Sequence, residues 1–429
     1  MIDPHTRYLR SIARLLALAA MLVAAPLAAQ NSSRSGSADS ARVVTINGQV
    51  RVRSEIDHRG VLADDGVLVH LLRSRLRATA RPLAGITAVV EIQDARYWGQ
   101  SDPTSGRGTS DADAEQLDMH QAWAAIDSVG GVPLSLRVGR QEMSFANERL
   151  IGVSNWSNTG RAFDAARATL HVDRASVDLF AARLTAPNPG PIASKNLYGV
   201  WSTWKPSSGL AVDLFGLRDD NTTHVRRGED TGHAVLERYT AGTWLRASAG
   251  TVEVELEGAL QAGRAATTDS SARRAIGAFM ASATLAAIVD SATRTRVFGL
   301  VTALSGDGSS DDDRTENFNT LFGTNHRVYG QMDIVPESIG GTAGLVDVAV
   351  GASVAPVKGV RLLFEAHRLA PQRGAGTFGA ELDLIGSWRA NPSLEVSGGG
   401  GIFLPGPLLE SRFGIDPVYW AYLMAQLDF

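Results

Sequence analysis

Apolar and polar residues alternate along much of this chain with a period of two. In the segment 45–57, Ile46, Val50 and Val52 fall on one parity, and polar or charged residues fall on the other. The segment 72–81 places mostly leucine and alanine on one parity and arginine or threonine on the other. Because successive side chains of a β-strand point to opposite faces, this pattern predicts strands with one apolar and one polar face.

Segments of this kind recur to the end of the chain, and we count about eighteen. They lie near 43–57, 68–81, 85–98, 115–127, 133–145, 161–173, 175–184, 195–204, 210–218, 234–248, 250–263, 274–286, 293–304, 342–355, 358–369, 377–389, 393–404 and 417–429.

The connections between these segments alternate between short and long. The long polar stretches are 99–114, 146–160, 219–233, 264–273, 305–341 and 405–416. Short turns on the periplasmic side and longer loops outside are typical of an outer-membrane barrel. The sequence therefore predicts an all-β fold, in which residues 43–429 form a single transmembrane antiparallel β-barrel of about eighteen strands with long extracellular loops.

The final segment gives the most specific part of this prediction. Tyr419, Leu423 and Phe429 share one parity with alanine and leucine, and Phe429 is the last residue. This ending resembles the signal that barrel-assembly machinery reads in bacterial outer-membrane proteins, so we expect that machinery and the lipid bilayer as partners. A buried terminal strand of a soluble domain is the alternative. Several tryptophans near strand ends are candidates for an interfacial aromatic girdle; they are Trp98, Trp201, Trp204, Trp388 and Trp420.

The first thirty residues have the pattern of a secretion signal. Arg7, Arg10 and Arg14 precede an apolar stretch over 15–25, and small residues follow at Ala28 and Ala29. We predict a signal peptide over 1–30 and a serine-rich flexible leader over 31–42. A membrane-anchoring helix is the alternative, but the apolar stretch is shorter than the roughly 20 residues that such a helix needs.

Composition narrows the class of protein further. The 429 residues carry a formal net charge of −4, which argues against a nucleic-acid-binding protein because such proteins are basic. The chain has no cysteine, so disulfides do not stabilise it. With the secretion signal and the strand pattern, this composition places the chain in the bacterial outer membrane.

The polar parity of the predicted strands should face the lumen, and its charges are unevenly distributed. Arginines cluster toward the N-terminus, at Arg51, Arg53, Arg73, Arg75, Arg77, Arg137 and Arg167. Carboxylates dominate later strands, at Glu253, Glu255, Glu257, Glu365, Glu381, Asp383 and Glu395, with Arg361 among them. An arginine row attracts anions and matches carboxylates in a bidentate way. The alternative is that these charges pair across the lumen and hold the strands in place.

The central third of the chain resembles a known family. The segments 136–145 (LRVGRQEMSF), 148–152 (ERLIG) and 156–164 (WSNTGRAFD), with 305–307 (SGD) and 322–333 (FGTNHRVYGQMD), are similar to the alginate-export family of outer-membrane porins. The resemblance spans most of the mature chain. It implies an eighteen-stranded barrel whose positively charged constriction passes an anionic uronate polymer to the outside.

The resemblance also implies roles for particular residues. Carried over by motif, Arg140 and Arg161 should be pore arginines with Asp164 beside them. Strict alternation from Leu136 would put Arg140 on the lipid face, where an arginine near mid-membrane costs roughly 2–4 kcal/mol. We therefore expect a β-bulge to turn Arg140 inward. The long segment 305–341, with His326 and Asp333 in its matching part, should form a constriction or lid.

Other chemistry finds little support in the sequence. The chain has neither a Gly-x-Ser-x-Gly nor a His-Glu-x-x-His motif, so we predict no enzyme, no catalytic residues, no cofactor and no metal. The acidic segment 307–313 offers oxygen ligands for calcium, but it lacks the EF-hand spacing, and a solvated loop is the preferred interpretation.

Two functional classes remain open at this point. The first is a monomeric channel that passes small anions or an anionic polysaccharide, with a general small-solute porin as its broader form. The second is a plugged barrel that serves as a surface anchor or assembly protein.

Overall fold

The computed structural model describes residues 43–59, 67–97, 115–185, 194–221, 236–266, 273–309, 312–335 and 343–429. The predicted signal peptide and leader lie outside these residues. No helix among the described residues is long and apolar enough to cross a membrane.

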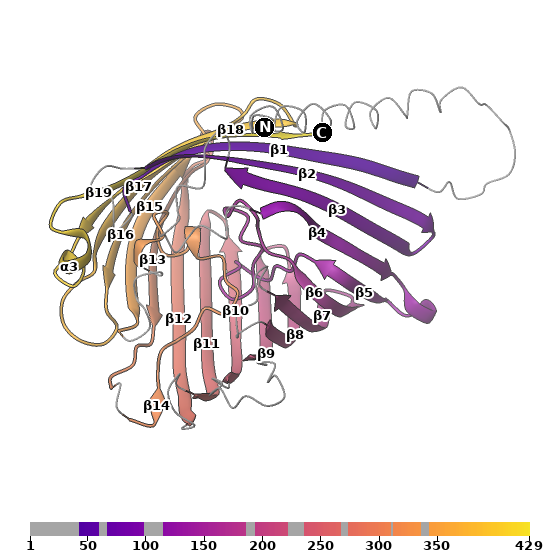
Figure 1. Ribbon diagram of the computed structural model, residues 1–429, viewed down its shortest axis with the longest axis horizontal. Coiled ribbons are helices and arrows are strands. Elements are labelled where there is room, and N and C mark those ends of the chain that lie inside the picture. The colour runs from indigo at the N-terminus through magenta and orange to yellow at the C-terminus, as the bar shows by residue number, and fades with distance from the viewer. Residues whose placement is uncertain are drawn as a thin grey trace, which may run out of the picture. The chain divides into compact units, whose positions relative to one another are not determined.

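Eighteen long strands and one short strand make a single sheet, as Figure 1 shows. The long strands are β1 (Val43–Asp57), β2 (Val67–Leu83), β3 (Ile86–Tyr97), β4 (Glu115–Ile126), β5 (Leu134–Gln141), β6 (Phe163–Val172), β7 (Ala175–Thr185), β8 (Ser194–Ser207), β9 (Leu210–Asn221), β10 (Leu236–Ala249), β11 (Val252–Ala266), β12 (Arg273–Asp290), β13 (Thr295–Leu304), β15 (Leu345–Val354), β16 (Val360–Ala370), β17 (Gly379–Arg389), β18 (Leu394–Pro405) and β19 (Val418–Asp428). The two-residue β14 (Arg314–Thr315) pairs with β12 in parallel. Three short helical turns complete the elements, η2 (Val129–Gly131), η3 (Asn325–Arg327) and α3 (Glu410–Phe413).

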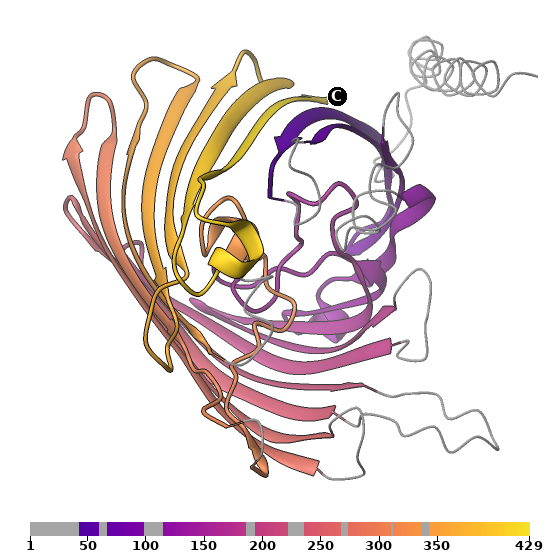
Figure 2. The same cartoon turned by 60° about the vertical axis from the view of Figure 1, so that its left-hand side comes forward.

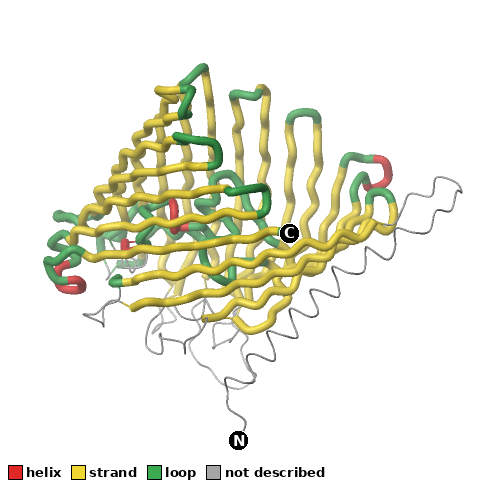
Figure 3. The backbone as a smooth tube through the Cα atoms, turned by 90° about the horizontal axis from the view of Figure 1, so that it is seen from above, coloured by secondary structure: helices red, strands yellow, loops and turns green. Residues whose placement is uncertain are grey.

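The sheet closes on itself. Each long strand pairs antiparallel with its neighbours in sequence, and β1 pairs with both β2 and β19. The turns between strands are short at one rim, which we call the short-turn rim, and the longer connections lie at the other (Figure 3). A closed sheet leaves no edge with unpaired backbone groups, which is what a spanning sheet requires in lipid. The predicted antiparallel barrel of about eighteen strands is confirmed.

The outer wall carries the apolar parity of the strands. Val138, Leu179 and Leu260 are 63, 56 and 68 % exposed, as are many similar side chains around the barrel. Phe429 pairs with Gly48 through both backbone groups, and a Cβ on Gly48 would lie 2.3 Å from the Phe429 ring. The terminal aromatic residue therefore packs directly over a glycine of the first strand on the outer wall.

The tryptophans divide between the two faces. Trp204 and Trp388 are about half exposed, near the short-turn ends of β8 and β17. Trp201 and Trp420 are 2 % exposed and lie on the inner parity of their strands, so the prediction that they form an interfacial girdle is wrong for them. Trp98 lies outside the described residues. Parity within the strand, rather than closeness to its end, decides which face a tryptophan takes.

Parts of two long connections fold into the barrel, where Figure 2 shows them inside the ring of strands. We call residues 142–162, between β5 and β6, the first inner loop, and the described residues 316–335, between β14 and β15, the second inner loop. The two loops join through a β-bridge between Ile151 and Phe322 and through a hydrogen bond from the Gly152 amide to the Phe322 carbonyl of 2.9 Å. The lumen is therefore partly filled by a body that both loops build.

An apolar cluster supports this body. Phe145 of the first inner loop stacks on Trp201, with ring centroids 4.8 Å apart, and Trp201 stacks on Phe215 at 4.4 Å. Phe163 meets Phe322 of the second inner loop edge to face at 5.4 Å. Because buried apolar area is the main favourable term in packing, this part of the inner wall is apolar rather than polar.

Candidate pore lining and the anchors of its loops

Four arginines of β1 and β2 face the first inner loop, and we call Arg51, Arg53, Arg73 and Arg75 the arginine wall. The Arg51 guanidinium donates to the backbone carbonyls of Asn155 at 2.6 Å and Ser157 at 3.0 Å, and to Asn158 Oδ1 at 3.3 Å. Arg51 is only 2 % exposed. Its guanidinium therefore interacts with oxygens of the first inner loop and not with solvent.

The other members of the arginine wall also donate hydrogen bonds to the first inner loop. Arg53 donates to the Trp156 carbonyl, and its guanidinium lies 4.0 Å over the Trp156 ring. Arg73 donates to Gln49 Oε1 at 2.7 Å and to Asn155 Oδ1 at 3.0 Å. Hydrogen bonds of this kind, with a charged donor, are stronger than neutral ones.

Arg75 and Arg77 continue the row toward the short-turn rim. Arg75 donates to Gln93 Oε1 at 2.6 Å and to the Thr159 carbonyl at 3.2 Å. Arg77 pairs with Glu91 at 2.5 Å, and its side chain is 41 % exposed. Sequence parity thus placed all five arginines on the inner face, and contacts with a loop and with carboxylates surround most of them there.

A second cluster lies beside Arg75, formed by Glu91, His120 and Glu142. Their ligand atoms lie within 4.8 Å of one another, which makes them the group in the described chain best arranged to hold a metal ion. Glu91 and Glu142 already pair with Arg77 and Arg75, at 2.5 and 3.4 Å. A cation here would have to displace or adjoin two arginines, so the cluster fits charge pairing better than metal binding.

The Glu142 carboxyl at the start of the first inner loop is held ionised. His120 Nε2 lies 2.8 Å from Glu142 Oε1. Burial raises the pKa of Glu142, but the hydrogen bond with His120 and the charges of His120 and Arg75 outweigh it, so that the net effect is a lowered pKa. Glu142 therefore keeps its negative charge at a lower pH than an ordinary glutamate does, and its contacts connect the loop to β2 and β4.

Another part of the inner wall, on β15 to β17, is acidic, and we call Asp347, Glu365, Glu381 and Asp383 the acidic wall. The Met332 amide of the second inner loop donates to Glu381 Oε1 at 2.8 Å, and Gln331 Nε2 donates to Glu365 at 2.9 Å. Gly330 has a φ of +92°, and a Cβ there would lie 2.3 Å from Glu381. The backbone of the loop thus comes close to the wall where glycine permits it.

The acidic wall is less fully satisfied than the arginine wall. Glu381 and Asp383 are 0 and 1 % exposed, and one carboxylate oxygen of each has no hydrogen-bond partner among the described residues. Asp347 accepts from His367 at 3.0 Å, but His367 Nε2 likewise has none. Buried carboxylates without partners are costly, so this wall is the weaker anchor.

Arg161 and Arg149 connect the two inner loops to each other and to the wall. Arg161 donates to the carbonyls of Phe322, Gly152 and Gly323. Burial lowers the pKa of Arg161 to about 10, and Glu148 opposes that shift. Arg149 pairs with Glu257 of β11 at 2.9 Å. Arg161, predicted as a pore arginine, lies at the joint of the two loops.

Trp156 and His326 form an aromatic contact between the loops and the barrel seam. The two rings stack at 4.1 Å, and His326 Nδ1 lies 2.6 Å from Asp333 Oδ2. Trp156 also meets Trp420 and Tyr422 of β19, at 5.6 and 4.8 Å. The predicted constriction residues His326 and Asp333 therefore contact each other inside the barrel, and their role in restricting passage stays a prediction.

Arg140 and Asp164 lie on the outer wall, which corrects the expectation that a bulge turns Arg140 inward. Arg140 Nε donates to Asp164 Oδ1 at 2.8 Å, and their side chains are 36 and 47 % exposed. Arg140 shares the parity of the exposed Val138, whereas its neighbour Gln141 is fully buried. Asp164 and, at 3.6 Å, Asp118 compensate the charge of Arg140 on this face, and the β5 pairings show no register shift, so alternation holds without a bulge.

Basic side chains gather at the short-turn rim, and we call six of them the basic mouth. Arg81, Lys205, Arg246 and Arg361 are exposed on the inner parity, Arg174 is exposed in a turn, and Arg137 is half-buried. Arg389, exposed at the same rim, pairs with Glu395 at 2.5 Å and is not counted among them. Arg361, at the start of β16, was predicted as pore-lining. Arg167, deeper in the barrel, pairs with Asp178 at 2.7 Å and lies over the Phe145 ring at 5.1 Å.

The acidic segment 307–313 gives no assembled calcium site in its described part. Asp307 and Asp312 each accept the amide two residues further on, at 3.2 and 2.9 Å. Such bonds are typical of turns. Residues 310 and 311 lie outside the described residues.

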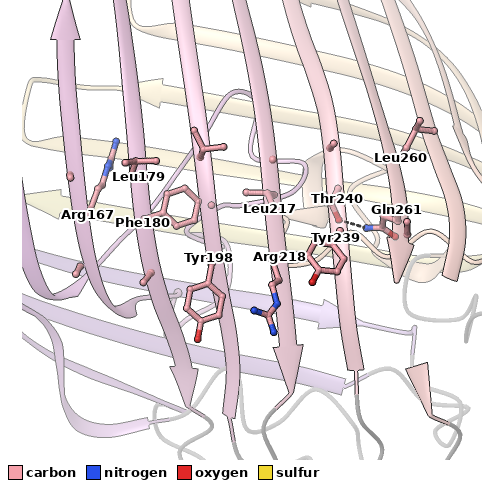
Figure 4. A pocket seen from close by; sticks show the side chains of 18 of the residues that line it. Arg167, Leu179, Phe180, Tyr198, Leu217, Arg218, Tyr239, Thr240, Leu260 and Gln261 are labelled. Atoms are coloured by element: carbon pink, nitrogen blue, oxygen red, sulfur yellow. Dashed lines mark hydrogen bonds between the residues drawn. The ribbon is translucent and has the colours of Figure 1, made fainter. Parts of the chain in front are cut away.

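A hollow of about 940 Å³ lies on the outer wall over β6 to β11, and Figure 4 shows it. Alanine and leucine are the commonest residues of its lining, and Tyr198, Arg218 and Tyr239 stand side by side at one end. Arg218 pairs with Asp220 and Glu237, both at 3.3 Å. This hollow belongs to the face that a membrane would cover and not to the lumen.

Sequence reasoning missed the partners of the arginine wall. The motif 156–164 was noted for its arginine, yet its backbone carbonyls and Trp156 make most of the contacts. A long segment with tryptophan, asparagine and glycine between two strands was the available signal, because such a segment needs partners for its backbone groups. Sequence reasoning named Arg137 and Arg361 of the basic mouth but missed Arg81, Lys205 and Arg246, which follow from parity at strand ends, and Arg174 in a turn.

Comparison with known proteins gives a family and a fold. The family model described as "Alginate export" matches residues 42–370. No curated protein matches the chain at a significant level.

Solved porins share the fold at low sequence identity. A BenF-like porin from Pseudomonas fluorescens Pf-5 has a TM-score of 0.62 at 9 % identity, over 90 % of this chain and 98 % of that one. OccD3 (OpdP) from Pseudomonas aeruginosa has a TM-score of 0.58 at 10 % identity, over 93 and 94 %. OccK2 (OpdF) from the same organism, solved in complex with glucuronate, has a TM-score of 0.58 at 9 % identity, over 90 and 98 %.

Proposed function

The chain belongs to the alginate export family and is an outer-membrane channel by fold, and we propose that it passes anionic solutes, above all an anionic uronate polysaccharide such as alginate. The family match over residues 42–370 carries this proposal. Family and fold are those of transport porins rather than enzymes. A barrel of this strand number is wide enough for an aqueous passage.

The basic mouth supports an anionic cargo. Its exposed side chains, including Arg81, Lys205 and Arg361, stand at the short-turn rim. In outer-membrane barrels this rim faces the periplasm. Rings of cationic side chains favour anions at a pore entrance, and exposed charges raise the local concentration of the opposite charge. A basic periplasmic entrance suits a polyanion that leaves the cell.

Glucuronate, bound in the OccK2 structure, is itself a uronate. A protein of similar fold is thus solved with a monosaccharide of the same chemical class, a uronate, as the units of the proposed cargo. We infer that the arginine wall contributes to this function indirectly, because it holds the first inner loop that narrows the lumen.

A plugged barrel that acts as a surface anchor is the second candidate. The two inner loops join each other and both walls, so they fill part of the lumen. A general small-solute porin is a broader form of the first candidate. Conductance and ion selectivity separate these three functions.

The test uses the whole protein in planar bilayers under a salt gradient. We expect open channels whose reversal potential shows anion preference. Neutralising two residues of the basic mouth (Arg81→Gln with Arg361→Gln) should shift the reversal potential toward cations. The matched control removes the same charge from the outer wall (Arg140→Gln with Arg183→Gln) and should leave the selectivity unchanged.

Each contrary result identifies another function. A barrel that conducts no ions would favour the plugged anchor. Open channels without ion preference, in which both double variants behave alike, would favour a general porin and reject the anionic cargo.

A further inference from the structure

A cavity of about 1030 Å³ lies inside the barrel at the short-turn rim, between β8–β10 and the first inner loop. Its lining includes Lys205, Trp244 and Arg246 on the wall, Arg174 in the turn after β6, and Ala146 on the loop. This volume is slightly above the roughly 300–1,000 Å³ found for small-ligand sites. The first inner loop thus borders one side of this cavity through Ala146, and strands β8 to β10 border the other, at the short-turn rim.

Three cationic side chains line this cavity, and carboxylates of the described chain compensate their charges only weakly. Lys205 forms no ion pair with a carboxylate in the part of the chain that the structure describes. Arg246 lies 3.9 Å from Glu253, and its side chain is 56 % exposed. Arg174 donates to the Pro206 carbonyl and is exposed. These three contrast with the arginine wall, whose guanidinium groups are buried under loop oxygens.

The rest of the lining suits a sugar. Trp244 supplies an aromatic surface, and Thr203 and Ser248 supply hydroxyl groups. Trp244 Nε1 and Asp213 Oδ1 are buried with no hydrogen-bond partner among the described residues. A sugar hydroxyl both donates and accepts, so it can serve an indole N–H and a carboxylate oxygen alike. Carboxylates, in turn, match arginine and lysine.

We propose that this cavity is a binding subsite for uronate units of an anionic saccharide, occupied before the chain passes the inner loops. The sugar carboxylates contact Lys205 and Arg246, and a sugar ring packs on Trp244. This inference rests on the proposed function, since it names where the cargo first binds. It adds that capture depends on a few residues at the wall and not on the charge of the whole mouth.

The test measures blockage of single channels by an oligouronate added from the short-turn side. We expect brief current blocks with the wild-type protein, and fewer or none with a neutral oligosaccharide of equal length. The double variant Lys205→Gln with Arg246→Gln should shorten the residence time at least about tenfold, because loss of even one of its two charged contacts corresponds to roughly that factor. Trp244→Leu should shorten it as well, by removing the stacking surface.

The matched control is Lys358→Gln, which removes a lysine from the turn between β15 and β16, outside the cavity lining. It should leave the residence time unchanged. Heat-modifiable electrophoretic mobility verifies that each variant still forms the barrel.

The outcomes separate this inference from the proposed function. Anion-selective channels whose blocks are equally long in the wild type and in Lys205→Gln with Arg246→Gln would overturn the subsite and keep the channel. If the barrel conducts no ions, calorimetric titration of the oligouronate into the protein in detergent still decides. Binding that this double variant loses would support the subsite, and the absence of binding by the wild type would reject it.

Discussion

The arginine wall and the acidic wall each hold an inner loop, but the arginine wall makes more hydrogen bonds to its loop than the acidic wall does. Arg51 alone reaches three backbone carbonyls and an amide oxygen within 3.3 Å. Glu381 accepts one amide of the second inner loop and leaves its other oxygen without a partner. The difference follows from chemistry, because a guanidinium offers five donors in a rigid fork, whereas neighbouring carboxylates repel each other.

This contrast changes how charges on a barrel wall are interpreted. An inward arginine in the sequence suggests a place for an anionic solute. Here the most strongly clustered arginines bind the backbone of their own chain, and the exposed cations stand at the short-turn rim. A charged row therefore indicates a polar partner, and exposure then shows whether that partner is a loop or a solute.

The largest effect should follow from loss of the strongest anchor. Arg51→Ala removes the guanidinium and leaves the carbonyls of Asn155 and Ser157 with only the longer contacts of Arg73 at 3.5 Å, at a cost on the order of 3 kcal/mol. We expect a lower unfolding midpoint in detergent and a several-fold larger conductance as the first inner loop detaches. Arg81→Ala, on the same barrel face but exposed, should change neither stability nor loop position. Equal effects of the two variants would show that Arg51 is no anchor.

A smaller, pH-dependent effect should come from Glu142. Since the pKa of Glu142 is lowered in the folded protein, its stabilisation is present above the ordinary pKa of about 4.5 and is lost as the pH falls through the lowered value. Glu142→Gln should therefore cost about 1 kcal/mol at neutral pH. Its unfolding midpoint should converge with that of the wild type on acidification below pH 4.5. A difference between the two proteins that stays constant with pH would contradict the assignment.

Neutralising the acidic wall should have the opposite sign. Asp383→Asn removes one of two neighbouring buried carboxylates, so we expect a gain of up to about 1 kcal/mol in unfolding free energy. The comparison variant is Asp178→Asn, whose carboxylate has an arginine partner at 2.7 Å and which should lose stability. Chemical unfolding of both proteins measures the pair. A large loss for Asp383→Asn would mean that the acidic wall is as strong an anchor as the arginine wall.

The smallest effect is expected on the outer wall. A double-mutant cycle of Arg140→Ala and Asp164→Ala should give a coupling below about 1 kcal/mol, because the pair is partly exposed. Ion selectivity should not change in either variant. A selectivity shift as large as the one expected for the basic-mouth variants would show that Arg140 faces the pore.

The fold was predictable because a membrane imposes one rule on every strand. Outward side chains must be apolar, so the period-two pattern gave strand positions such as 210–218 for β9 (Leu210–Asn221) and the parity of each residue. Arg140 shows the strength of this rule, since parity was right and the motif-based expectation of a bulge was wrong. Alternation therefore deserves precedence over motif for choosing a face.

The site was less predictable because parity names a face and not what lies against it. Nothing in the period of β1 and β2 states that Trp156 and the carbonyls beside it, about a hundred positions later, cover their arginines. Loops lack a repeating pattern, so their position depends on tertiary contacts such as the bridge between Ile151 and Phe322. Which basic residues stay exposed, at the basic mouth, became clear only after this burial was known.

Trp156 has a consequence for the mechanical integrity of the barrel. β1 and β19 come from opposite ends of the sequence, so their junction is the one longitudinal joint that no turn connects. Trp156 contacts Arg53 on one side of this joint and Trp420 and Tyr422 on the other. Trp420 also donates to Glu55 across it at 2.9 Å. Trp156, from the middle of the chain, thus crosslinks β1 and β19 from inside the barrel. These contacts resist separation of the first and last strands under lateral tension.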